Sequence, residues 1–269
     1  MASNEVLILE KYKDGQKEDG RATNSRSSAF EFHYTKRHLE GYITKESRVL
    51  EVGCGTGYYG IHYGPFCREY VGIDIVPAHV DIFREKIRAA GYANVSCRVG
   101  DATNLSDIPD GAFDVVLCLG PCYHLPPAER ETVLRECCRV CRAGGVVAVA
   151  YINKIGLVAG ACTYDDWRHI YPSEEGNRSA LIDGTDDLKP GLFYFTTPEE
   201  VDALAAATGL CKEKNLGTDF FILAKVADTI EEERFHLLLP LYDALTSHES
   251  CTGTSNHALY VGRKPAPCP

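Results

Sequence analysis

The sequence predicts an α/β fold with a doubly wound, mainly parallel sheet, on the evidence of three observations. Short apolar runs of strand length alternate with segments whose apolar residues recur at helical spacing. Glycine-rich or acidic turns follow the strands, as in Gly53-Cys54-Gly55-Thr56-Gly57 after the first strand. The longest apolar run, Val146–Ile152, has the length of a buried strand and is too short to span a membrane.

The chain is expected to begin with a polar, loosely attached arm over residues 1–20, followed by a helix over 28–42. Strands and helices alternate from Arg48 onward. One helix begins at Pro77 and is closed by Gly91, and another begins at Pro127 and ends at Gly144-Gly145. A capping box begins a further helix at Thr197. The expected strands are 48–52, 70–75, 95–99, 113–119, 146–152, 210–216 and 257–261.

Two long stretches interrupt the alternation of strands and helices. We expect them to form a cap, because insertions after strand ends commonly cover the ligand crevice of an α/β protein. Residues 228–248 have the pattern of an amphipathic helix, and the stretch 154–196 is rich in aromatic side chains: Tyr164, Trp167, Tyr171, Phe193, Tyr194 and Phe195. The alternative for these aromatics is a small core of the insertion itself. We expect a single domain over 1–269 with helical cap insertions. Its core would cover about 45–153, 197–225 and 255–264, and its caps 20–44, 154–196 and 226–254.

Composition narrows the function classes. With 28 basic and 38 acidic side chains the net charge is -10, which gives nucleic acid no general attraction. No apolar segment predicts a signal peptide or a membrane span. The 12 cysteines are not spaced like a secreted disulfide framework, so we expect reduced thiols and a cytoplasmic location. The oligomeric state is left open.

The glycine loop after the first strand gives the first indication of the ligand. Gly55-Thr56-Gly57-Tyr58-Tyr59-Gly60 satisfies G-x-G-x-x-G between a predicted strand and a helix, which is the dinucleotide-binding pattern. Asp74 ends the next strand, 21 positions after Gly53, where a carboxylate accepts hydrogen bonds from ribose hydroxyls. From these residues alone, a nicotinamide-dependent oxidoreductase is one alternative.

A broader set of segments resembles class I S-adenosylmethionine-dependent methyltransferases. Val49 through Gly57 looks like the first motif of that family, and Val71-Gly72-Ile73-Asp74 resembles the second. Gly100-Asp101-Ala102, Phe113 through Leu119, and Arg142-Ala143-Gly144-Gly145 resemble the segments that follow. A further likeness, in Leu119 through Leu125 and Gly253 through His257, is to bacterial small-molecule methyltransferases of unassigned substrate.

The resemblance implies a Rossmann-like seven-stranded sheet whose last strand is antiparallel, with S-adenosylmethionine as methyl donor and S-adenosylhomocysteine as product. It also implies that Asp74 holds the ribose and Asp101 the adenine amino group. The predicted cofactor-binding residues are Glu51, Gly53, Cys54, Gly55, Gly57, Asp74, Ile75, Asp101, Ala102 and Leu119. No metal is expected, because methyl transfer needs mainly alignment of donor and acceptor.

The acceptor is expected to be a small molecule, with a nucleic-acid or protein methyltransferase as the alternative. The sequence does not tell whether oxygen, nitrogen, sulfur or carbon is methylated. His124 follows the fourth strand and is the candidate general base, unless it only caps or packs against the next helix. Predicted acceptor-binding residues are Tyr123, Tyr151, Asn153 and His257, and Tyr12, Arg26 and Tyr34 are candidates to close over the site.

Overall fold

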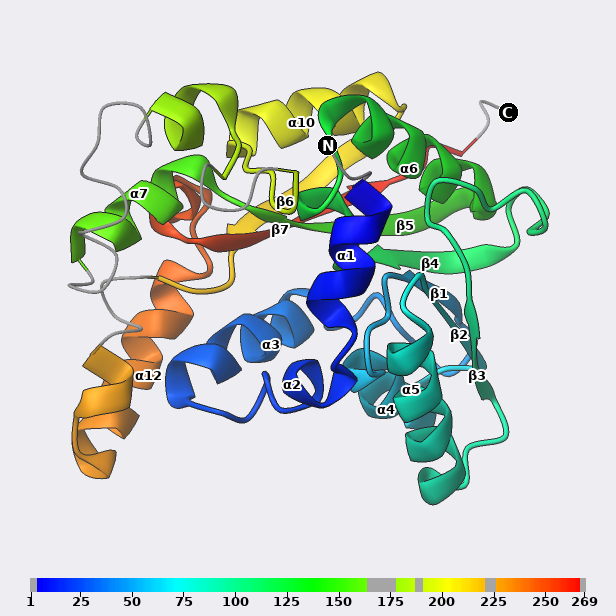
Figure 1. The fold of residues 1–269 in the computed structure, drawn as a ribbon, viewed down its shortest axis with the longest axis horizontal. Helices are drawn as coiled ribbons and strands as arrows, with labels where there is room; N and C mark the ends of the chain where they lie inside the picture. The colour runs from blue at the N-terminus through cyan, green and yellow to red at the C-terminus, as the bar shows by residue number, and fades with distance from the viewer. Residues whose placement is uncertain (1–3, 164–177, 187–190, 221–225, 267–269) are drawn as a thin grey trace.

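A seven-stranded sheet organises the protein. The computed structural model describes residues 4–163, 178–186, 191–220 and 226–266 (Figure 1). The strand order is β3-β2-β1-β4-β5-β7-β6, with β7 antiparallel to both of its neighbours. The predicted doubly wound sheet with an antiparallel last strand is therefore confirmed. The strands are β1 (Arg48–Val52), β2 (Glu69–Asp74), β3 (Val95–Val99), β4 (Phe113–Cys118), β5 (Cys141–Ile152), β6 (Cys211–Gly217) and β7 (His257–Arg263).

Helices cover both faces of the sheet and its carboxyl-end edge. They are α1 (Asn4–Tyr12), α2 (Gly15–Asp19), α3 (Arg26–His38), α4 (Tyr58–Tyr63), α5 (Pro77–Ala90), α6 (Pro127–Val140), α7 (Lys154–Thr163), α10 (Pro198–Ala207) and α12 (Glu232–Leu245). Short irregular helices are η1 (Gly64–Phe66), η2 (Pro121–Tyr123), η3 (Ser179–Asp183) and η4 (Glu249–Thr254).

Each face of the sheet has its own apolar core. Side chains of α6 and α10 pack with one face in a cluster that includes Leu134 and Val201. Side chains of α3, α4 and α5 pack with the other in a cluster that includes Phe32, Tyr59 and Phe83. The three layers bury the strands on both sides, which explains why the central strands read as nearly continuous apolar runs.

Most of the sequence signals for the beginning or end of a helix predicted the observed position. Thr197 forms the predicted capping box with Glu200, and Gly91 closes α5 in the left-handed conformation with φ 68°. The helix α3 ends at His38 and not at residue 42, and α6 ends at Val140 and not at Gly144-Gly145, so both helices end earlier than predicted. The chain enters β5 already at Cys141, where the Lys264 ammonium donates to the carbonyls of Cys138 and Cys141 at the end of the helix.

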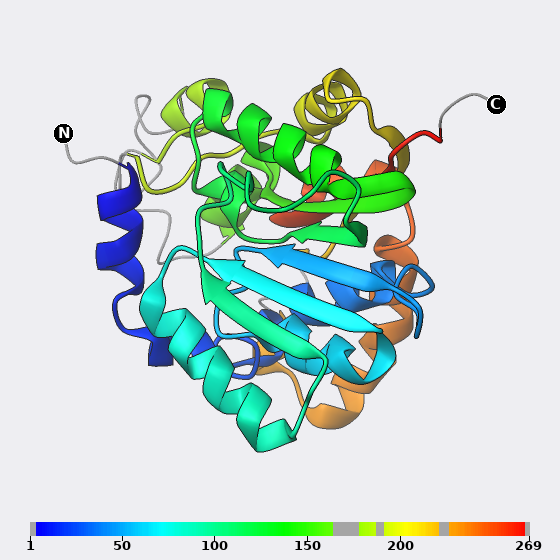
Figure 2. The ribbon, with the colours of Figure 1, turned by 90° about the vertical axis from the view of Figure 1, so that its right-hand side faces the viewer.

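The N-terminal segment differs most from its prediction. Residues 4–19 form α1 and α2 in place of a loose arm, and the arrowheads of the parallel strands point toward α1 (Figure 2). Ile8 of α1 packs with Val76 and Leu192 in a small apolar cluster. The stability of α1 therefore comes from tertiary contacts rather than from its own sequence.

Candidate active site

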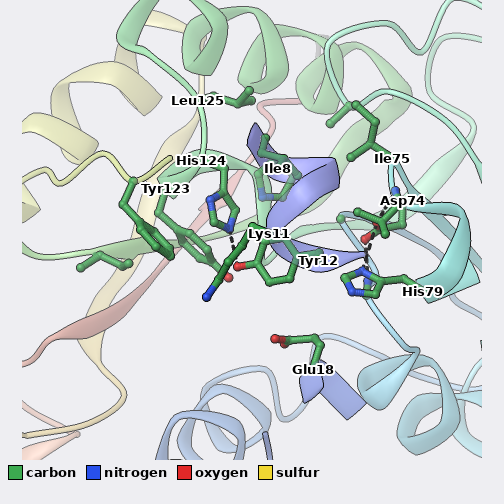
Figure 3. A pocket seen from close by; sticks show the side chains of 18 of the residues that line it. Ile8, Lys11, Tyr12, Glu18, Asp74, Ile75, His79, Tyr123, His124 and Leu125 are labelled. Carbon is green, nitrogen blue, oxygen red and sulfur yellow. Dashed lines mark hydrogen bonds and ion pairs between the residues drawn. The ribbon is translucent and has the colours of Figure 1, made fainter. Parts of the chain in front are cut away.

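A cavity of about 870 Å³ lies at the carboxyl ends of the strands, beneath α1 and α2. One side is lined by the turns after β1, β2, β3 and β4, and the other by residues at the ends of β5 and β7 and from α7. The sheet order reverses between β1 and β4, and α/β proteins bind ligands in the crevice at such a switch point. Figure 3 shows Tyr12 of α1 reaching into the cavity between His124 and the Asp74–His79 pair.

The Asp74 carboxylate is fixed by the backbone around it. Its Oδ2 accepts a hydrogen bond of 2.7 Å from the Gly55 amide, and its Oδ1 accepts one of 2.9 Å from the Val76 amide. The Nδ1 atom of the buried His79 lies 3.4 Å from Oδ1. This local network positions the acid at the end of β2, beside the glycine loop that it partly holds.

The glycine loop needs its glycines for two separate reasons. Gly55 has φ +52°, and a Cβ atom there would meet nothing within 4 Å, so its backbone is open for a ligand to approach closely. Gly53 has φ +72°, and a Cβ atom there would lie 2.5 Å from the ring of Pro121. The loop after β4 is therefore packed directly on the loop after β1.

The structure brings only part of the predicted donor site to the cavity. Gly53, Gly55, Asp74, Ile75, Asp101 and Ala102 line it. Glu51, Cys54, Gly57 and Leu119 are not among the lining residues. The Asp101 carboxylate accepts hydrogen bonds from the amide and hydroxyl of Thr103 and lies at the exposed rim.

Glu51 is oriented toward the protein interior. Its carboxyl accepts a hydrogen bond of 2.6 Å from the Tyr70 hydroxyl, and only 1% of the residue is exposed. Burial raises the pKa of Glu51 to about 8, against the lowering effect of the Tyr70 hydrogen bond. Glu51 is therefore mostly a neutral carboxylic acid at pH 7.

Both ring nitrogens of His124 have partners. Its Nε2 lies 2.9 Å from the Tyr12 hydroxyl, and its Nδ1 lies 2.8 Å from the Leu192 carbonyl. Burial lowers the pKa of His124 to about 4, so the ring is neutral at pH 7. A neutral ring satisfies both contacts when Nδ1–H donates to the carbonyl and the tyrosine hydroxyl donates to Nε2. The arrangement ties α1 to the loop after β4.

Of the four residues predicted to bind the acceptor, Tyr123 and His257 line the cavity and the other two do not. The Tyr151 ring is buried in the core, where its hydroxyl donates to the Asn215 side chain at 2.7 Å. The Asn153 amide is fully buried and donates to three backbone carbonyls between residues 252 and 255. Both side chains lie at strand ends, as expected, but their hydrogen bonds hold neighbouring segments against the sheet.

Several charged side chains are linked to His257 by close contacts. Its Nδ1 is 2.7 Å from Oδ2 of Asp219 and 3.9 Å from Oε2 of Glu31. Glu31 also accepts a hydrogen bond of 2.6 Å from Arg21, which in turn contacts Glu18 at 2.8 Å. Burial alone would favour the neutral ring, but the two carboxylates outweigh it and raise the pKa of His257 to about 9.

Sequence reasoning missed several of these residues. Arg21 and Asp219 carry no local pattern that marks them as functional. Arg26, considered as a lid residue, pairs with Glu232 on α12 instead, and Tyr34 is buried against Tyr242. Among the aromatic residues of the predicted cap, Phe193 and Phe195 line the cavity, whereas Tyr164, Trp167 and Tyr171 lie outside the described residues.

Comparison with known proteins identifies the family. A methyltransferase domain family matches residues 49–145. The ubiquinone biosynthesis O-methyltransferase of Pseudomonas aeruginosa is 31% identical over 163 residues, which cover 55% of this chain and 68% of that relative. The chain belongs to the class I S-adenosylmethionine-dependent methyltransferases. This membership confirms the predicted resemblance and leaves the nicotinamide-dependent alternative without support.

Other members of the methyltransferase family differ in what their names say they methylate. A protein-L-isoaspartate O-methyltransferase of Syntrophobacter fumaroxidans is 33% identical over 32% of this chain and 34% of its own length. The chain spans between 36% and 51% of the length of three further curated relatives that it matches. A Thermotoga maritima structure described as a possible histamine N-methyltransferase aligns with a TM-score of 0.60 and 16% identity, over 96% of this chain and 98% of that one. Such a likeness bears on the fold alone.

Two further findings concern metals and membranes. In the described part of the chain, no group of three or more histidine, cysteine, aspartate or glutamate side chains is arranged to hold a metal ion. Among the same residues, no helix has the length and apolar character needed to cross a bilayer.

Proposed function

We propose that the protein transfers the methyl group of S-adenosylmethionine to a small-molecule acceptor inside the cavity beneath α1 and α2. The observation that carries this proposal is the position of α1, which is hydrogen-bonded across part of the site. Asn4 at the start of α1 donates to the carbonyls of His124 and Gly191, and Tyr12 at its end contacts the His124 ring. A small molecule fits beneath α1, whereas this helix limits the access of a nucleic acid or a folded protein to the glycine loop.

The residues present suit S-adenosylmethionine. The open backbone at Gly55 allows close approach of the donor, and Asp74 would accept hydrogen bonds from the ribose hydroxyls. Asp101 and Ala102 would contact the adenine. S-adenosylmethionine supplies a methyl group activated by a sulfonium charge, which acidic surroundings favour. The charged side chains that line the cavity include the acidic Asp14, Glu18, Asp74, Asp101 and Asp186 and the basic Lys11, Lys17 and Arg21.

The volume of the cavity supports an acceptor of modest size. About 870 Å³ lies in the upper part of the ~300–1,000 Å³ range of small-molecule sites, which leaves room for a donor and an acceptor together. The net charge of -10 also opposes nucleic acid as the acceptor. Methyl transfer would then depend on holding the two molecules in line, and we expect it to proceed without a metal.

The donor half is tested with S-adenosylhomocysteine. Binding should raise the melting temperature, because a ligand of the native state stabilises it. Asp74→Ala should weaken the affinity at least about a hundredfold, since it removes charged hydrogen bonds worth ~1.5–3 kcal/mol each. Asp107→Ala, at an exposed carboxylate outside the cavity, serves as the control and should bind like wild type. An unchanged affinity in Asp74→Ala would contradict the assigned ribose site.

The acceptor half is tested with S-adenosylmethionine labelled in its methyl group and a cell extract divided by ultrafiltration. The label should enter the low-molecular-weight filtrate. Incorporation into protein or nucleic acid of the retained fraction, with none in the filtrate, would refute the small-molecule proposal while leaving the family assignment intact.

A further inference from the structure

We infer that His257, oriented by Asp219, is the group that takes a proton from the methyl acceptor, and that the acceptor is an apolar small molecule with a hydroxyl or N–H as its nucleophile. The inference rests on the proposed function and names the chemistry of the same site. His257 is the catalytic residue in this scheme, and Asp219 is a positioning residue.

The fold holds the His257 ring by one nitrogen and leaves the other available. Asp219 follows β6 and contacts Nδ1 at 2.7 Å, while its other oxygen accepts the His257 backbone amide at 2.7 Å and the Ser255 hydroxyl at 3.0 Å. Nε2 lies 3.5 Å from the Asn256 amide nitrogen, which is too long for a strong hydrogen bond. A carboxylate behind one nitrogen fixes the ring and increases the basicity of the other.

Another histidine that lines the cavity is less suited to the task. His124 already uses Nε2 for Tyr12 and Nδ1 for Leu192, and only 7% of the residue is exposed. It would have to break a buried hydrogen bond before it could receive a proton from an acceptor. His257 can receive the proton without breaking its bond to Asp219.

The surroundings of His257 indicate the body of the acceptor. Ile152 is the direct partner of His257 in the antiparallel pairing of β5 and β7, so the two side chains lie on the same face. Ile152 packs with Leu157 and Phe195, and all three line the cavity. An apolar or aromatic body against these side chains would bring its polar group to the histidine.

The sheet order also places the two halves of the reaction side by side. The donor residues follow β1, β2 and β3, and Ile152 and His257 lie at the ends of β5 and β7, with β4 between the two groups. In the transfer, the acceptor lone pair forms the bond to the methyl carbon, the carbon–sulfur bond breaks toward sulfur, and the acceptor proton passes to Nε2 of His257.

The charges around His257 link its proton to donor binding. The groups that face the ring are Asp219 after β6, Glu31 on α3, Arg21 between α2 and α3, and the Asn256 amide. The two carboxylates stabilise the protonated ring, which raises the pKa of His257. A sulfonium cation in the same cavity opposes that proton, so donor binding would lower the pKa of His257 and increase the fraction of neutral rings that can act as a base.

The first test compares two probes on the full chain labelled with ¹³C in its histidine rings. S-adenosylhomocysteine has a neutral sulfur, whereas sinefungin carries an ammonium group at the position of the methylated sulfur. The His257 signal, assigned by its loss in His257→Gln, should titrate about one pH unit lower with sinefungin than with S-adenosylhomocysteine. The exposed His236 is the internal control, and its signal should not differ between the two complexes.

Asp219→Asn tests the positioning role. The amide keeps an oxygen for the His257 backbone but loses the negative charge, so the pKa of His257 should fall toward that of an ordinary histidine while S-adenosylhomocysteine still binds.

In the comparison of S-adenosylhomocysteine with sinefungin, an identical His257 titration in both wild-type complexes would overturn the inference. Failure of either probe to bind would instead overturn the donor site of the proposed function.

The second test uses methyl transfer into the same ultrafiltrate. His257→Gln should lower the rate by about 10²–10⁴-fold, the usual contribution of a positioned acid–base group, with the affinity for S-adenosylhomocysteine within a few-fold of wild type. His236→Gln should transfer like wild type. Wild-type transfer by a folded His257→Gln protein would refute the assignment of the base.

Discussion

The packing of the glycine loop can be tested at Gly57, where the structure predicts a large cost for one added methyl group. Gly57 has φ +84°, and a Cβ atom there would lie 1.9 Å from the ring of Phe83. Gly60 and Gly72 face the same ring, with Cβ positions 2.2 and 2.8 Å from it. The fully buried ring therefore fills a space that three glycines leave, and it has no room to retreat.

Gly57→Ala should lower the free energy of unfolding by about 2–5 kcal/mol. Left-handed backbone costs alanine ~1–2 kcal/mol, and forcing a methyl group into a packed core adds ~1–3 kcal/mol. Gly91→Ala is the matched control, because Gly91 has φ +68° but nothing lies within 4 Å of its Cβ position. Gly91→Ala should lower the free energy of unfolding only by the cost of left-handed backbone for alanine, ~1–2 kcal/mol. Urea unfolding of both variants at one temperature measures the difference.

A double-mutant cycle separates the two terms at Gly57. In a Phe83→Leu background the smaller side chain leaves space for the methyl group, so the added cost of Gly57→Ala should fall toward that of Gly91→Ala. Equal costs for Gly57→Ala and Gly91→Ala in the wild-type background would show that the ring does not press on the loop, and the reasoning would fail.

Two predictions follow from shifted pKa values. His124 has a pKa of about 4 in the folded protein, below its unfolded value of ~6.5, so its neutral form stabilises the fold above pH 6.5 and this stability is lost as the pH falls. Between pH 7 and 5 the wild type should lose about 2 kcal/mol more than His124→Gln, and equal losses in urea unfolding would contradict the buried neutral ring. The pKa of Glu51 is raised to about 8, so its contribution is present below the unfolded value and is lost as the pH rises toward 8. Between pH 5 and 7.5, Glu51→Gln should gain about 3 kcal/mol relative to wild type, and no gain would place an ionised carboxylate at this position.

The part of the fold that depends on local sequence could be predicted well. β1 and β3 have the boundaries expected from the sequence, because each strand is closed by a glycine or an acidic turn. Asp74 and Gly55 could be placed together for the same reason, since they follow adjacent parallel strands and meet at one edge of the sheet. The donor half of the site is encoded by segments that are short and continuous.

The acceptor half could not be predicted in this way because its contacts join distant segments. Asp219 and His257 are 38 residues apart and meet only through the pairing of β6 with β7. A shift of one residue in that register would turn His257 to the other face of the sheet. The position of Tyr151 illustrates the same limit, because a strand end near the crevice does not fix which way its side chain points.

The helix α1 was missed for a reason that bears on how the site works. Its apolar residues form the run Val6–Leu9 and show little helical periodicity, and a nine-residue helix is marginal in isolation. It is held by Ile8 in the cluster with Val76 and Leu192, and by hydrogen bonds from Asn4 and Tyr12 to the segment around His124. These partners belong to both sides of the cavity. The cover of the site is therefore stabilised by the walls it covers, and the sequence of α1 alone does not specify a helix until those walls have formed.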